Sequence, residues 1–61
     1  MEKIKERFLK AYSNLPDIIR GEILVVVDDK TYSWNSAYFE IKNNSKIGEV
    51  ILKTLDELDI I

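Results

Sequence analysis

The chain has 61 residues, which is near the lower size limit for a domain that folds without disulfides or structural metals. It contains no Cys and no His, which excludes disulfides, thiolate chemistry and the side chain that most often serves as acid–base catalyst and metal ligand. A hydrophobic fraction of 46%, a charged fraction of 33% and a net charge of −2 indicate one globular domain over residues 1–61, not a disordered chain or a strongly basic nucleic-acid binder.

Apolar side chains in the first 15 residues recur every three or four positions, which predicts a helix. These side chains are Ile4, Phe8, Ala11, Tyr12 and Leu15. A proline disfavours helical backbone in the residue before it, so Pro16 indicates that the helix ends near Asn14. We expect residues 16–21 to form a short helical turn that Gly21 closes.

Residues 22–28 have the strongest strand pattern, because Ile23 and residues 25–27 are β-branched. The run is apolar on both faces, which predicts that both faces are at least partly covered. Asp28-Asp29-Lys30 supplies turn residues, and residues 31–33 can return as an antiparallel partner. The sequence therefore predicts a β-hairpin.

Two structures are open for residues 34–42. As a helix, the segment places Trp34, Ala37, Tyr38 and Ile41 on one stripe, with Ser33 in the N-cap position. As a strand, it would complete a three-stranded meander, but its side chains sort poorly between the two faces. We favour the helix.

A second pair of signals predicts the last helix. Asn43-Asn44 ends the preceding element, because Asn tolerates the left-handed backbone that ends a helix. Ser45 follows as the predicted N-cap of the last helix. The predicted apolar stripe consists of Ile47, Val50, Ile51, Thr54, Leu55, Leu58 and Ile61. The elements together predict a small α+β domain in the order helix, β-hairpin, helix, helix, with helix, three-stranded meander, helix as the alternative.

The location of the protein is expected to be cytoplasmic. The N-terminal stretch is charged and amphipathic, and it lacks the apolar region of a signal peptide. The longest apolar run, residues 23–27, is far shorter than the roughly 20 residues that a membrane helix needs. We expect no membrane association.

Such a small core favours self-association, since more buried apolar surface would add to a narrow stability margin. Three apolar residues fall outside the predicted stripes: Leu9, Phe39 and Leu52. Either they are ordinary exposed side chains, or they border an interface with a second copy or another protein. We take them as candidate interface residues.

Charge is distributed unevenly although its total is small. Lys3, Arg7 and Lys10 line one side of the first predicted helix, whereas Glu49, Asp56 and Asp59 line the outer side of the last. Each sign lies at the unfavourable end of its helix dipole. We therefore predict that the start of the first helix lies beside the end of the last, within one chain or across a dimer.

No pattern in the chain points to catalysis or to a cofactor. Adjacent Asp28 and Asp29 would point apart in a hairpin, and Asp is a standard turn residue, so we interpret them as a turn and not as a carboxylate pair or metal site. We expect a non-enzymatic protein–protein interaction module with no cofactor, self-associating or an accessory subunit.

Two groups of residues offer more specific hypotheses. The edge formed by Lys3, Arg7 and Lys10 can steer an acidic partner or, alternatively, contact nucleic-acid phosphates, with weak and salt-sensitive binding. Trp34 and Tyr38, one helical turn apart, are expected to anchor the hairpin to the last helix. The alternative is that they rim a binding cleft together with Phe39.

Overall fold

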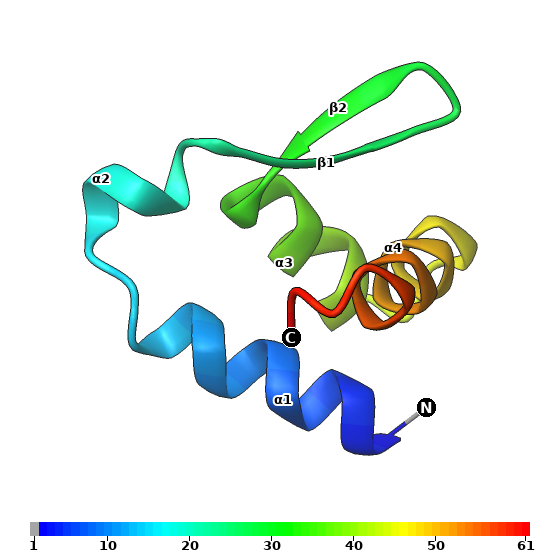
Figure 1. The fold of residues 1–61 in the computed structure, drawn as a ribbon, viewed down its shortest axis with the longest axis horizontal. Helices are drawn as coiled ribbons and strands as arrows, with labels where there is room; N and C mark the ends of the chain where they lie inside the picture. Colours follow the sequence, from blue (N-terminus) through cyan, green and yellow to red (C-terminus); the bar gives the residue numbers. More distant parts are fainter. Residues whose placement is uncertain (1) are drawn as a thin grey trace.

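Four helices and one hairpin make up the chain, which a computed structural model describes over residues 2–61 (Figure 1). In chain order they are α1 (Glu2–Ser13), α2 (Asp17–Arg20), β1 (Ile23–Val27), β2 (Lys30–Ser33), α3 (Trp34–Lys42) and α4 (Lys46–Glu57). The predicted α+β order of helix, β-hairpin, helix, helix is confirmed. Residues 34–42 are helical, so the three-stranded alternative is wrong.

Helix α3 lies at the centre of the fold, with the hairpin on one side and α1 on the other (Figure 1). Helix α4 packs against α3, α1 and β1. The helices therefore cover only one face of the hairpin. Val25 and Val27 point into the core, whereas Val26 is 58% exposed and Ile23 is 64% exposed. The prediction that both faces of this strand are at least partly covered is wrong for the face of Ile23 and Val26, because the helices all pack on the other face.

The hairpin turns through two residues with left-handed backbone. Asp28 has φ 50° and Asp29 has φ 65°, which is the pattern of a type I′ turn. The strands pair antiparallel, and their register shifts between Ile23 and Val25, so Leu24 forms a bulge in β1. The twist of a type I′ turn matches the twist of the strands and fixes this register.

Both predicted serine caps are present. The Ser33 hydroxyl accepts the Ser36 N–H at 3.1 Å, and the Ser45 hydroxyl accepts the Gly48 N–H at 3.0 Å. Asn44 has φ 55°, as expected for the residue that ends α3. The Ser45 N–H then donates to the Glu40 carbonyl at 3.2 Å, which closes a Schellman motif.

The buried face of α4 includes Ile51 and Leu55 as predicted, but it is rotated from the predicted stripe toward Leu52. Its buried residues are Gly48, Ile51, Leu52 and Leu55. Val50 and Leu58, both on the predicted stripe, are 41% and 60% exposed. Leu52 is 4% exposed, so its predicted place outside the core is wrong.

Gly48 explains this rotation of α4. A Cβ atom on Gly48 would lie 2.5 Å from the carbonyl oxygen of Glu40. The glycine therefore allows the two helix backbones to approach closely, and the approach draws the Leu52 side of α4 into the core. A count of apolar side chains does not register this, because glycine has none.

The core lies where α1, α3, α4 and β1 meet. It contains eight buried side chains: Phe8, Val25, Val27, Ala37, Ile41, Ile51, Leu52 and Leu55. Leu9 is half-buried and packs against these residues. Leu9 thus lies at the margin of the core, because α1 contacts both α3 and α4 and so buries a broader arc than the predicted stripe.

The two charged helices meet within one chain, as predicted, but the middle of α1 and not its start lies beside the end of α4. Arg7 of α1 and Asp56 in the last turn of α4 form an ion pair at 3.6 Å. Both side chains are about half exposed, so solvent screens the pair and it adds little to the stability of the fold. The pair shows that the middle of α1 is a neighbour of the last turn of α4.

Candidate protein-binding surface

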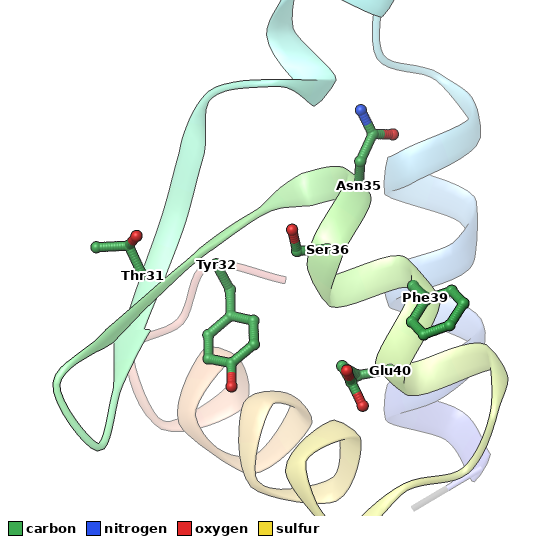
Figure 2. A pocket seen from close by; sticks show the side chains of 6 residues that line it. All are labelled: Thr31, Tyr32, Asn35, Ser36, Phe39 and Glu40. Atoms are coloured by element: carbon green, nitrogen blue, oxygen red, sulfur yellow. The ribbon is translucent and has the colours of Figure 1, made fainter.

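A hollow of about 430 Å³ lies between β2 and α3. Its walls consist of Thr31, Tyr32, Asn35, Ser36, Phe39 and Glu40 (Figure 2). The first two residues come from the strand, and the other four come from the first two turns of the helix. The hollow is open to solvent along one side, so it is a surface groove and not an enclosed cavity.

The direct passage from strand to helix creates this hollow. β2 ends at Ser33, and the same residue caps α3, so no linker separates the two elements. The Ser33 hydroxyl also lies 3.1 Å from the Ser36 hydroxyl, which ties the first helical turn to the strand end. The chain therefore changes direction sharply at Ser33, and the hollow is the space left between β2 and α3.

Glu40 is the only acidic residue among the lining residues. It is half-buried, and its Oε1 atom accepts a hydrogen bond from the Ser45 hydroxyl at 2.7 Å. This contact holds the side chain beside the start of α4. The hollow therefore contains one positioned negative charge.

Phe39 supplies the main apolar surface of the site. Its side chain is 63% exposed, and in Figure 2 its ring projects from α3 on the side away from Tyr32. An aromatic ring of this exposure beside a hollow is typical of residues that anchor protein interfaces.

Phe39 is the predicted interface residue that the structure leaves available. Leu52 belongs to the core, and Leu9 packs against it. The three residues predicted together are therefore not brought together on one surface. Thr31, Asn35, Ser36 and Glu40 were missed by the sequence analysis.

The other predicted aromatic residues stack against the first helix. The Tyr38 and Tyr12 rings lie 4.3 Å apart and nearly parallel, and the Trp34 ring lies 5.7 Å from that of Phe8. We expected this pair to attach to the last helix, but the rings that stack on them belong to α1. Neither Trp34 nor Tyr38 is among the residues that line the hollow.

A hydrogen bond connects this stack to the hollow. The Tyr12 hydroxyl donates to Asn35 Oδ1 at 2.6 Å. Asn35 is therefore held from behind by α1 while it lines the hollow in front. The stacked Tyr12 ring therefore fixes the position of Asn35 at the hollow.

Arg20 was not recognised in the sequence as a structural residue. Its guanidinium donates to the carbonyl oxygens of Tyr12 at 3.1 Å and of Ser13 at 3.3 Å. It also lies 4.5 Å from the centre of the Tyr12 ring and pairs with Asp17 at 3.3 Å. Arg20 thus satisfies carbonyls at the end of α1 and holds α2 against it.

The predicted basic residues lie on α1. Lys3, Arg7 and Lys10 are all exposed and line a hollow of about 350 Å³ with Glu6. Since all four residues come from one helix, this hollow is a shallow depression between side chains. Arg7 is already paired with Asp56, and Glu6 adds a negative charge to the group.

Within residues 2–61, no three acidic side chains come close enough together to form a metal site. Over the same residues, none of the helices has the length and apolar character required to cross a membrane. Comparisons with models of protein families, with curated proteins and with solved structures gave no match to this chain.

Proposed function

We propose that this chain is a small cytoplasmic, non-enzymatic module that binds a protein partner through the hollow between β2 and α3. The observation that carries the proposal is the exposure of Phe39 beside this hollow. An exposed aromatic ring next to a concave, partly polar surface offers both an anchor and a place for a partner's side chain.

The chemistry of the lining supports binding over catalysis. The Ser36 hydroxyl has the Ser33 hydroxyl as its neighbour at 3.1 Å, and a hydroxyl does not activate a nucleophile as a base would. The Glu40 carboxylate is engaged by Ser45. These groups are arranged to accept and donate hydrogen bonds to a bound chain.

The test compares two exposed apolar side chains of almost equal accessibility. Phe39 is 63% exposed and Ile23 is 64% exposed, but only Phe39 lines the hollow. The wild type, Phe39→Ser and Ile23→Ser would each be used for affinity capture and for measurement of mass in solution. We expect the wild type and Ile23→Ser to bind the same partner, a second copy included, and Phe39→Ser to lose it.

The proposal fails if Phe39→Ser and Ile23→Ser behave alike. Equal retention of the partner would place the binding surface elsewhere on the molecule. A monomer that captures nothing in all three cases would remove the interaction function altogether. Circular dichroism melting of each variant shows whether the fold is intact.

A second candidate function uses the exposed cations of α1. Lys3, Arg7 and Lys10 lie on one side of this helix, where they can contact the phosphates of a nucleic acid. The test is retention on heparin or DNA as a function of salt, with Lys3→Glu/Lys10→Glu compared with Lys46→Glu/Lys53→Glu on α4. Loss of retention in the α1 variant alone supports this function, and equal behaviour of the two variants rejects it.

A further inference from the structure

The hairpin leaves one regular strand edge without a partner. In a two-residue hairpin the residues that flank the turn, here Val27 and Lys30, form a hydrogen-bonded pair. The next hydrogen-bonded pair is Val25 and Tyr32. The intervening Thr31 therefore directs its N–H and C=O away from β1, toward the free edge of β2.

The two edges of the hairpin differ in regularity. The bulge at Leu24 interrupts β1, and bulges are one of the features that protect edges from further pairing. β2 has no bulge in this register and no proline. Its edge also borders the hollow, because Thr31 and Tyr32 line both. The β2 edge is thus open to another strand.

We propose that a second copy of this chain pairs with β2 edge to edge, antiparallel and centred on Thr31. The result is a symmetric dimer with a four-stranded sheet in the order β1, β2, partner β2, partner β1. The inference rests on the proposed function, since it names the partner that the hollow binds. It uses β-strand addition, in which main-chain hydrogen bonds give affinity and side-chain pockets give specificity.

Charge complementarity favours a second copy as the occupant. In an antiparallel pair centred on Thr31, Lys30 lies opposite the partner's Tyr32. Lys30 and Tyr32 both lie on the helix-covered face, because they pair with the buried residues Val27 and Val25. Lys30 is exposed and therefore free to extend across this face.

The Lys30 side chain of one copy reaches into the hollow of the other copy. Tyr32 and Glu40 line the same hollow, and Glu40 is its only acidic residue (Figure 2). Each dimer therefore forms two equivalent contacts between Lys30 and the partner's Glu40. Phe39 also lines this hollow, with its ring on the side of α3 away from Tyr32.

Exchange of the two charges is the decisive experiment. The variants are Lys30→Glu, Glu40→Lys and the double variant, and the measurement is the dissociation constant by sedimentation equilibrium. Each single variant places like charges together and is expected to weaken association at least about tenfold. The double variant restores the opposite charges and is expected to recover the wild-type constant to within about threefold. The double variant Lys46→Glu/Glu49→Lys on α4 is the matched control and should leave the constant unchanged.

Proline substitutions test the edge itself. Thr31→Pro removes the N–H that points to the free edge of β2, and it leaves the hydrogen-bonded pairs with β1 in place. Val26→Pro does the same at the free edge of β1. We expect Thr31→Pro to abolish association and Val26→Pro to preserve it, with melting curves confirming that both variants fold.

Three results would overturn the inference. The first is a wild type that stays monomeric at concentrations up to about 1 mM, above which even weak specific pairing is populated. The second is a dimer whose dissociation constant is unchanged by both the charge variants and Thr31→Pro. The third is two single charge variants that weaken association without recovery in the double variant. If the wild type is monomeric while Phe39→Ser still loses a different captured protein, the proposed function stands and only this inference fails.

Discussion

The α3–α4 corner (residues 40–48) and the β-hairpin (residues 23–33) differ in how completely their polar and apolar groups are matched. At the corner, the Ser45 hydroxyl caps α4 and contacts Glu40, and Gly48 brings the two backbones together. In the hairpin, one sheet face is open, the outer edges of both strands are unpaired and both turn residues have positive φ. At the corner, the polar groups find hydrogen-bond partners within the chain. In the hairpin, backbone groups and apolar side chains remain exposed and accessible to another molecule.

This difference places the stabilising contacts at the corner, and the proposed binding surface includes the β2 strand of the hairpin. Residues that hold the corner should be sensitive to substitution. Substitutions in the hairpin should leave the free energy of unfolding unchanged or raise it, because surfaces that bind partners retain groups that are unfavourable in the free protein. Four experiments test this contrast.

The largest effect is expected for Leu52→Ala. Leu52 is 4% exposed, so its truncation leaves a cavity and should lower the free energy of unfolding by about 2–5 kcal/mol. Leu58→Ala is the control, because Leu58 is 60% exposed and its truncation should change the free energy by less than about 0.5 kcal/mol. Urea unfolding monitored by Trp34 fluorescence measures both. Equal effects would contradict the rotation of α4 described above.

Gly48→Ala should destabilise the fold, against the usual trend for glycine within a helix. The new methyl group would lie 2.5 Å from the Glu40 carbonyl oxygen, and we expect a loss of about 1–3 kcal/mol. At Gly21 the nearest atom to an added methyl group is 3.7 Å away, so Gly21→Ala should be neutral or stabilising. Thermal melting of the two variants separates these outcomes, and a Gly48→Ala protein that melts higher than the wild type would refute the close approach.

The two helix caps allow a direct comparison of the corner with the hairpin. Ser45→Ala removes the cap of α4 and the contact with Glu40, and should cost about 1–2 kcal/mol. Ser33→Ala removes the cap at the hairpin end and should cost about 0.5–1 kcal/mol. Chemical denaturation provides both values. If Ser33→Ala proves the more costly, the corner is not the more tightly held region.

A change in the hairpin turn should be favourable but small. Asp28 and Asp29 both adopt left-handed backbone, and Asn-Gly is the preferred pair for a type I′ turn. The variant D28N/D29G is therefore expected to raise the free energy of unfolding by about 0.5–1 kcal/mol. The melting temperature should rise accordingly. A lower melting temperature would mean that the aspartates make contacts that compensate for their backbone strain.

The elements of this fold could be predicted because their signals are local. Ser33 and Ser45 cap helices through bonds to residues three positions along the chain, and Asn44 ends α3 through its own backbone preference. Such contacts depend on a few neighbouring residues. The pairing of Arg7 with Asp56 could also be anticipated, because misplaced charges on two helices implied a common location.

The surfaces could not be predicted in the same way. The orientation of α4 depends on Gly48, whose contribution is the absence of a side chain next to another helix. The open face of β1 depends on which side of the hairpin the helices pack, which no pattern within residues 23–27 records. The hollow is defined by the angle between β2 and α3, so its lining residues share no sequence motif. A serine cap directly after a strand is the one signal that could have pointed to it.

Arg20 also has a consequence for the order in which the chain assembles. It closes a loop of only eight residues to Tyr12, whereas the stack of Tyr12 on Tyr38 spans 26 residues and the bond from Lys5 to Asn44 spans 39. Short loops cost less chain entropy to close, so we expect residues 2–20 to reach their native arrangement before α3 docks. Arg20→Ala should then slow refolding more than it speeds unfolding. The Arg20 guanidinium thus orders the end of α1 early, and α3 then docks its aromatic rings against the rings of α1.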